Sequence, residues 1–381
     1  MWKTVKLGEI CELNYGKALD KKDRVENGII PAYGANGIKA FANKPLYDKP
    51  SILIGRKGSA GEINKVVEPF WALDVTYYVT TDGSIVDLDF LFYALTTLNL
   101  PSMARGVKPG INRNDVYDRS INLPPLAEQQ RIVAKLDAAF AEIDEIIEQT
   151  EQKLHQAKLL MQKVIDENIG FESSDTFQTK LDDFCDIKHG FAFEGKSFSL
   201  SDDESKPIVL TPGNFSENGT TKFNRNNTKR LQTIYDEKLL FSLNDLVVVM
   251  TDLSSKMPLL GKPAFIKQSN ILHNQRIGLV QNNEQVIVNE YLYFYFQSTD
   301  YLNEIKKTAS GTMVRHTAPK RILSNTIKAP QSLSQQREIS QKIKLSLSTL
   351  ENLINIYRNK ISNSVALKSA ILAQELQSEA A

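Results

Sequence analysis

Two long stretches of the chain repeat apolar residues at alternating spacings of four and three. Residues 126 to about 169 contain no Pro or Gly, and their apolar positions are Leu136, Phe140, Ile143, Ile147, Leu154, Ala157, Met161 and Val164. Residues 333 to 376 continue the pattern with Ile343, Leu347, Leu350, Ile354, Tyr357, Ile361 and Ile371, and Ser364 and Lys368 interrupt it. This spacing places one apolar stripe along a helix, which must pack on another helix to leave water. The pattern therefore predicts two long helices that pack as a coiled coil.

Shorter apolar runs, separated by glycine-containing turns, occur before the first long helix and between the two. Runs of this length predict strands, and an amphipathic spacing predicts a helix. In the first part we expect strands at 51–54 and 74–79 and a helix at 88–98. In the second part we expect strands at 246–249 and 277–280 and a helix at 289–297. Each part therefore has mixed α and β structure.

The second half of the chain repeats features of the first half in the same order. The matching segments are 7–13 with 181–187, Gly16 with Gly190, 89–93 with 290–294, 104–106 with 309–311, and 129–131 with 335–337. Several matches in one order favour duplication over chance. The offset between them grows along the chain, which places roughly thirty extra residues in the second copy, before its aromatic helix. A short segment, 170–176, links the first long helix to the second globular part and favours an antiparallel return of the helices.

The composition is that of an ordinary soluble globular protein. The chain has 381 residues, 41% of them hydrophobic and 24% charged, which predicts two or three domains and excludes wholesale disorder. No apolar run approaches the ~18 residues needed to cross a bilayer, and the N-terminal residues lack the apolar core of a signal peptide. We therefore expect a cytoplasmic protein without membrane contact. Two cysteines, Cys11 and Cys185, are too few for a disulfide framework and are expected in the core.

Basic residues cluster locally although the formal net charge is only +1. Residues 90–114, 253–283 and 305–337 contain no Asp or Glu, and two of these stretches occupy the same place in the two copies. Most charge runs are only solvated faces, but this repetition favours phosphate binding. Loops 33–39 and 55–61 add amide and cationic side chains that can pair with base edges. The candidate contacts to duplex DNA are Asn36, Lys39, Arg56, Lys57, Arg105, Lys108, Arg113, Lys256, Arg276, Arg315, His316, Lys320 and Arg321.

The sequence offers no candidate catalytic residue, metal ligand set or cofactor loop. Loop 55–61 lacks the Gly-Lys-Ser/Thr ending of a phosphate loop. The segment 122–126 lacks the Asn-Pro-Pro-aromatic order of amino-methyltransferases, because Leu123 intervenes and Leu126 is not aromatic. The four histidines are scattered rather than paired at metal-ligand spacing.

The run Leu-Pro-Pro-Leu-Ala-Glu-Gln-Gln-Arg-Ile-Val at 123–133, placed between a globular part and a long helix, resembles the first conserved region of Type I restriction-modification specificity subunits. Segments 30–38, 52–58 and 69–74 are similar to a common type of recognition domain in that family. With the internal repeat, the resemblance covers essentially the whole chain. The second copy departs from it, because residues 329–337 lose the paired prolines and the Glu, and no Gly-Arg-Lys-Gly loop is present.

The resemblance implies an α+β fold with two target recognition domains, at 1–125 and 170–331. Two long antiparallel helices, at 126–169 and 332–377, would separate them as a coiled-coil spacer. It also implies a non-catalytic subunit that reads a split duplex DNA target, one half per domain, with the helices setting the gap. An alternative is a stand-alone methyltransferase or nuclease with a duplicated DNA-binding part, and a third possibility is a coiled-coil scaffold that binds only proteins.

The partners implied by the resemblance are two modification subunits and the restriction subunits. The modification subunits would bind S-adenosylmethionine and methylate adenine, so that this chain itself needs no cofactor. The residues expected to contact these partners lie at the starts of the two helices: Leu126, Gln129, Gln130, Arg131, Gln335, Gln336 and Arg337.

Overall fold

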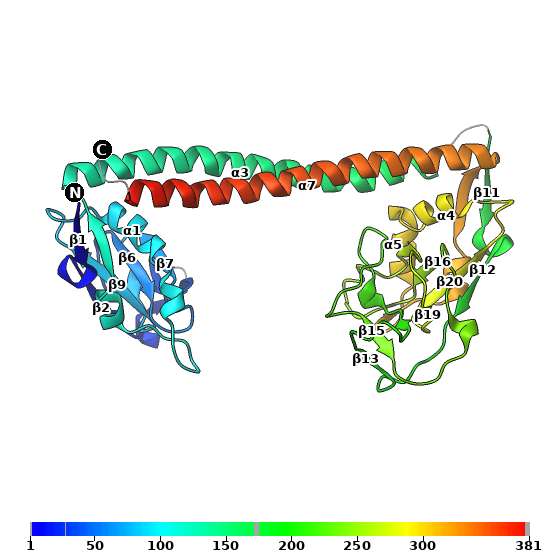
Figure 1. The fold of residues 1–381 in the computed structure, drawn as a ribbon, viewed down its shortest axis with the longest axis horizontal. Coiled ribbons are helices and arrows are strands. Elements are labelled where there is room, and N and C mark those ends of the chain that lie inside the picture. Colours follow the sequence, from blue (N-terminus) through cyan, green and yellow to red (C-terminus); the bar gives the residue numbers. More distant parts are fainter. Residues whose placement is uncertain (1, 27, 171–174, 378–381) are drawn as a thin grey trace. The chain divides into compact units, whose positions relative to one another are not determined.

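The computed structural model describes residues 2–26, 28–170 and 175–377, which form two compact units. Unit 1 comprises Met1–Glu151 and Arg358–Ala381, and unit 2 comprises Gln152–Tyr357. The division falls inside the two long helices, α3 (Leu126–Asn168) and α7 (Leu333–Gln377), which are coloured teal and orange to red in Figure 1. Both expected long helices are therefore present. Most of the expected link at 170–176 lies outside the described residues.

The strands in the described residues of unit 1 form two four-stranded sheets and one strand pair. The strand order of the main sheet is β2 (Cys11–Tyr15), β9 (Thr76–Thr81), β6 (Ser51–Gly55) and β7 (Ile63–Val66). The order of the second sheet is β3 (Arg24–Val25), β5 (Gly37–Ala42), β4 (Ile30–Gly34) and β8 (Trp71–Ala72). The antiparallel pair β1 (Lys3–Lys6) and β10 (Ser120–Leu123) leads into α3.

Strand β6 is buried at every position because both faces of the main sheet are covered. Ile52 and Ile54 belong to the core that the sheet shares with helix α1 (Leu88–Thr97). Leu53 points the other way and packs with Phe70 and residues of the second sheet. Alternate residues of a strand face opposite sides, so unit 1 has three layers: helix, sheet and sheet.

Unit 2 has the same strand orders as unit 1. Its main sheet is β12 (Cys185–His189), β20 (Ile277–Asn282), β16 (Leu246–Val249) and β18 (Pro263–Phe265). Its second sheet is β13 (Phe198–Leu200), β15 (Lys229–Leu231), β14 (Ile208–Val209) and β19 (Ile271–Leu272), and β11 (Thr176–Lys180) pairs with β22 (Thr326–Pro330). Helix α4 (Asn289–Tyr295) covers the main sheet and is followed by α5 (Thr299–Thr308).

The local predictions agree with these elements to within two residues at each end. The expected strands at 51–54, 246–249 and 277–280 and the helices at 88–98 and 289–297 are confirmed. The strand expected at 74–79 begins two residues later, because Thr76 closes a turn by donating from its backbone N–H and its hydroxyl to the carbonyl of Leu73. Cys11 and Cys185 are buried free thiols, as expected, and burial raises the pKa of each to about 12.

Within unit 1 the first part of α3 and the last part of α7 lie side by side in antiparallel directions (Figure 1). The Lys135 Nζ lies 2.6 Å from the Glu375 Oε1, and the Lys368 Nζ lies 2.8 Å from the Asp144 carboxylate. Residue numbers therefore increase along α3 while those of the contacting α7 residues decrease, as in antiparallel helices. Lys368 stands where the apolar spacing expects a hydrophobic residue, and its ammonium lies 4.7 Å from the centre of the Phe140 ring.

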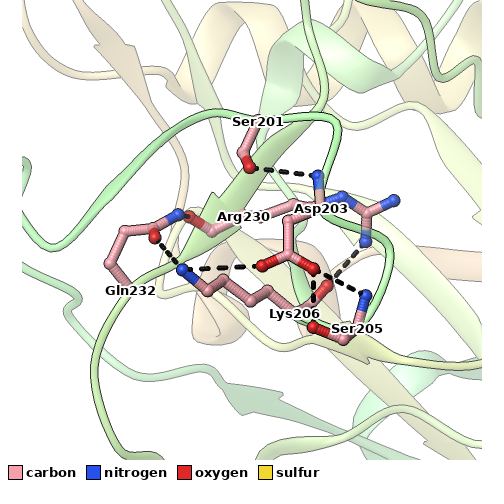
Figure 2. Close-up of polar contacts among 6 residues, drawn as sticks. All are labelled: Ser201, Asp203, Ser205, Lys206, Arg230 and Gln232. Carbon is pink, nitrogen blue, oxygen red and sulfur yellow. Dashed lines mark hydrogen bonds and ion pairs between the residues drawn. The ribbon is translucent and has the colours of Figure 1, made fainter.

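The longer segment between β12 and β16 of unit 2 includes a polar loop fastened to β15, shown in Figure 2. The Lys206 ammonium lies between Gln232 and the Asp203 carboxylate, which also accepts hydrogen bonds from Ser205. The Arg230 Nη1 donates to the Lys206 carbonyl over 2.6 Å. These side chains bind one another, so this cluster holds the loop on the sheet.

Candidate nucleic-acid interface

Two loops of unit 1 that are far apart in sequence carry most of its candidate DNA contacts. Loop 55–61 follows β6, and the Gly58 N–H donates to the Pro109 carbonyl over 3.2 Å. The Ile111 N–H donates to the Arg56 carbonyl over 3.0 Å. This backbone pairing brings Arg56 and Lys57 beside loop 104–111, which carries Arg105 and Lys108. Lys57, Arg105 and Lys108 are exposed.

Glycines allow these loops to turn tightly. Gly61 has a φ of +84°, and a Cβ there would lie 2.4 Å from the Pro101 nitrogen. Gly106 has a φ of +94°. Both conformations strongly favour glycine. Unit 2 has Gly261 (φ +82°) and Gly311 (φ +90°) in the corresponding loops, so the two units build this edge from similar turns.

Asn36 lies in the turn of the β4–β5 hairpin and Lys39 lies on β5, close to loop 55–61. Asn36 and Lys39 are exposed, and Gly37 in the turn has a φ of +110°. A Cβ built on Gly55 would lie 3.0 Å from the Ala35 Cβ, so the hairpin turn approaches the start of loop 55–61. The structure therefore gathers all the candidate DNA-binding loops of unit 1 at one end of its main sheet.

Arg56 and Arg113 approach one aromatic ring. The Arg56 Nε and Nη2 donate to the Asp74 carbonyl over 3.0 and 2.7 Å, and the guanidinium carbon lies 5.4 Å from the centre of the Tyr15 ring. Arg113 begins helix α2 (Arg113–Tyr117), and its guanidinium carbon lies 5.2 Å from the same centre and 5.7 Å from that of Tyr117.

Tyr15 is not among the contacts that the sequence predicts. Its position carried a signal, because alternation along β2 puts Tyr15 on the same side as the buried Cys11 and Leu13. Tyr15 nevertheless ends the strand and is 49% exposed. An aromatic residue that continues a core-facing pattern past the edge of the core is a candidate surface contact.

Unit 2 gathers its candidates at the corresponding end of its main sheet. β17 (Thr251–Asp252) pairs with β21 (Arg315–His316), and the Met250 N–H donates to the Arg276 carbonyl over 2.9 Å. This pairing brings Arg276, from the acid-free stretch 253–283, close to Arg315 and His316, from the acid-free stretch 305–337. Lys256 is exposed on the loop before Gly261, and Lys320 and Arg321 are exposed on helix α6 (Pro319–Leu323).

Arg315 is more heavily engaged than the other candidates of unit 2. Its Nη1 donates to the Gly311 carbonyl over 2.6 Å, its Nη2 to the Ala309 carbonyl over 3.4 Å, and its Nε lies 3.3 Å from the Met257 Sδ. The His316 Nδ1 lies 3.0 Å from the Thr251 hydroxyl. Arg315 therefore braces loop 309–316.

The expectation that Gln129 contacts a partner is wrong for its side chain, which is fully buried. The Gln129 Nε2 donates to the carbonyls of Ile85 and Pro124 over 3.1 and 2.9 Å, and its Oε1 accepts from the Asp87 N–H over 2.8 Å. A side chain with these three bonds is a structural clamp. It joins the start of α3 to the start of α1 and to the end of β10.

The same correction applies to Gln336, which is also fully buried. Its Nε2 donates to the carbonyls of Val286 and Pro330 over 3.0 and 2.9 Å, and its Oε1 accepts from the Val288 N–H over 2.9 Å. Gln336, rather than Gln335, therefore occupies the place of Gln129. The sequence match of the two Gln-Gln-Arg runs was wrong by one residue, because one extra residue separates Pro330 from the start of α7 at Leu333.

The other expected partner contacts remain accessible. Gln130, Gln335 and Arg337 are exposed, and Leu126 is partly exposed. Arg131 forms a two-bond ion pair with Glu128, with N–O distances of 2.7 and 2.8 Å.

No helix in the described ranges is long and apolar enough to span a membrane. The same part of the chain contains no group of three or more His, Cys, Asp or Glu side chains arranged to hold a metal ion.

Comparison with known proteins places both halves of the chain in one group. A family model described as "Type I restriction modification DNA specificity domain" matches residues 1–156 and again residues 174–366.

The curated relatives include the EcoprrI specificity subunit of Escherichia coli, 28% identical over 137 residues that cover 34% of each chain. They also include the EcoDI specificity subunit of Escherichia coli, 29% identical over 165 residues that cover 42% of this chain and 35% of the relative. The matched region thus spans only about a third of each relative.

Two solved structures share the fold. A chain from "Structural basis underlying complex assembly and conformational transition of the type I R-M system" has a TM-score of 0.76 at 17% identity, covering 100% of this chain and 98% of that one. The HsdS subunit of Thermoanaerobacter tengcongensis has a TM-score of 0.58 at 16% identity, covering 100% and 97%. At these identities the likeness concerns the fold.

Proposed function

The chain belongs to the Type I restriction modification DNA specificity family, and from this premise we propose that it is the DNA sequence-specificity subunit of a Type I restriction-modification enzyme. The observation that carries the proposal is that each half of the chain matches the DNA specificity domain separately. The equal strand orders of the two units support it. Two copies of one DNA-reading module in one chain suit a target with two parts.

We propose that each recognition domain reads one half of a split duplex target through the loops at the end of its main sheet. In unit 1 the exposed Lys57 lies on a loop that approaches the hairpin carrying Asn36, and the exposed Arg105 and Lys108 lie on the loop paired with it. Lys can bind guanine acceptors and Asn can bind adenine on two atoms. Unit 2 presents different side chains at the corresponding place, including Arg276 and His316. The two halves of the target therefore have different sequences.

The helices α3 and α7 act in this proposal as the spacer that sets the gap between the half-sites. A helix of about forty residues spans roughly 60 Å at 1.5 Å per residue. The proposed four-part division is a recognition domain at 1–125, a helix at 126–169, a second recognition domain at 170–331 and a second helix at 332–377. The two recognition domains would be copies of an internal repeat.

The chain itself is non-catalytic in this proposal. Two modification subunits would carry S-adenosylmethionine and methylate adenine, and restriction subunits would join them for cleavage. The exposed Gln130, Gln335 and Arg337 at the starts of the helices are the proposed docking contacts. Bases must leave the stack to be methylated, so positioning the methyltransferase at a defined place on the duplex is the task that falls to this chain.

The direct test is to sequence methylated genomic DNA from cells with and without this chain. We expect methylation at a motif of two short tracts separated by a gap of indifferent sequence, and its loss when the chain is removed. Footprinting of the complex with its modification subunit should protect the same two tracts. One continuous tract would contradict the proposal. Binding of S-adenosylmethionine by the isolated chain would instead favour the stand-alone methyltransferase.

A further inference from the structure

Two arginines of unit 1 approach the same tyrosine ring. The guanidinium carbons of Arg56 and Arg113 lie 5.4 and 5.2 Å from the centre of the Tyr15 ring. Within the described parts of the chain, neither arginine forms an ion pair with an Asp or Glu side chain. Both positive charges thus lie against one aromatic ring, which is a weaker partner for a guanidinium than an anion is.

The hydrogen bonds of the two arginines within the chain leave donors unused. Arg56 donates from Nε and Nη2 to the Asp74 carbonyl, which leaves its Nη1 without a partner in the described residues. Arg113 donates from Nη1 to the Leu13 carbonyl at the long distance of 3.5 Å, and its buried Nε has no partner among those residues. Bonds within the chain therefore leave part of the donor capacity of both guanidinium groups for an anion.

We propose that Arg56, Arg113 and Tyr15 form a phosphate-binding site that holds the DNA backbone in unit 1. A guanidinium fork matches the geometry of phosphate oxygens, and one phosphate would neutralise the charge that no carboxylate balances. This inference rests on the proposed function and refines it. The carbonyl of Asp74 fixes Arg56 in place, so Arg56 positions the duplex. Lys57, the exposed neighbour of Arg56, is then the residue of this loop that is free to read bases.

The site is a property of unit 1. In the sequence repeat, the residue that corresponds to Tyr15 is His189, which ends β12. The nitrogens of Arg315, a cation of the neighbouring loop, lie against atoms of unit 2 itself. The two units are therefore expected to differ in how many backbone phosphates they neutralise.

The experiment measures binding of the full chain, alone and with any modification subunit that co-purifies with it, to a pool of random-sequence duplexes over a range of salt concentrations. The variants are Arg113→Gln, Arg56→Gln and Lys57→Gln, with Arg119→Gln as the control for loss of one exposed positive charge in the same unit. Sequencing of the bound fraction gives the base preference at each position. Thermal unfolding of each variant checks that it is folded.

We expect Arg113→Gln and Arg56→Gln each to reduce the steepness of the log–log salt dependence by about 1, the value for one lost phosphate contact. Base preference at every position should stay that of the unchanged chain. Lys57→Gln should instead relax the preference at one position of one half-site, and Arg119→Gln should change neither property. Using two independent arginine variants keeps the test decisive if one of them fails to fold.

A salt dependence that Arg113→Gln and Arg56→Gln leave unchanged would overturn the inference, as would a change of preference confined to one base pair. Neither result would affect the proposed function, since the unchanged chain would still bind DNA. Absence of salt-dependent binding by the unchanged chain would contradict the proposed function itself.

Discussion

Gln129 and Gln130 are neighbours in sequence and have opposite roles in the structure. The side chain of Gln129 is buried and forms three hydrogen bonds to backbone groups, whereas that of Gln130 is exposed. The sequence pattern of a Gln pair at a helix start does not separate the two, because the direction of each side chain depends on the rotation of the helix against the sheet. Gln336 and Gln335 repeat the contrast in unit 2.

Replacing Gln129 by Leu should destabilise unit 1 strongly. The substitution leaves the carbonyls of Ile85 and Pro124 and the Asp87 N–H without their partner, at about 1–3 kcal/mol for each group that stays buried. We expect a loss of about 3 kcal/mol in the free energy of unfolding, measured by urea titration. Gln130→Leu, the matched control, should change it by less than about 0.5 kcal/mol. An equal change in the free energy of unfolding for the two variants would contradict the structural role of Gln129.

His273 gives unit 2 a pH-dependent stability. Its ring is buried, its Nε2 lies 2.8 Å from the Ile277 carbonyl, and burial lowers its pKa from the ordinary value of 6.5. Below pH 6.5 the unfolded chain gains a proton at this residue that the folded chain resists. The stabilisation is therefore full above pH 6.5 and decreases as the pH falls from there toward the lowered pKa.

The measurement for His273 is the free energy of unfolding of unit 2 between pH 8 and pH 5. His273→Gln keeps a donor for the Ile277 carbonyl and should flatten this dependence. His155→Gln, on the exposed face of α3, should leave it unchanged. An identical decrease in stability in all three proteins would show that another group titrates.

At the scale of the element, α7 tolerates a lysine in its apolar stripe because the helix next to it provides two partners. Lys368 is 26% exposed, binds the Asp144 carboxylate of α3 and lies over the Phe140 ring. A long side chain can bury its methylene stem and keep its charge at the surface. The apolar spacing therefore predicts α7 correctly. Lys368 interrupts the apolar spacing but not the helix.

Lys368→Met should leave the stability of unit 1 within about 1 kcal/mol of the original, because partly exposed ion pairs contribute little and a thioether side chain restores the apolar stripe. Lys368→Glu should destabilise unit 1, because it places a second carboxylate beside Asp144. Thermal unfolding measures both variants, with the exposed Lys360→Met as the control. A stability of Lys368→Glu equal to that of Lys368→Met would show that the ion pair does not form.

At the scale of the whole molecule, the proposed spacer makes helix length a determinant of the DNA target. Insertion of one heptad into each helix, after Glu151 and after Tyr357, keeps the apolar stripes in phase. It adds about 10 Å at 1.5 Å per residue, which corresponds to about three base pairs. We expect sequencing of methylated DNA to show a gap longer by about three base pairs and unchanged half-site sequences. A target with its original gap would contradict the spacer.

The sequence by itself determined the two long helices, the central strands and the aromatic helices, because these depend on the spacing of apolar residues along a continuous segment. It also predicted an internal repeat and the loops that carry the candidate contacts. Only the tertiary structure decided that Gln129 corresponds to Gln336, that Arg56 and Arg113 share the Tyr15 ring, and that short strands such as β8 and β14 complete a second sheet. Those features depend on groups far apart in sequence, whose distances no local pattern records.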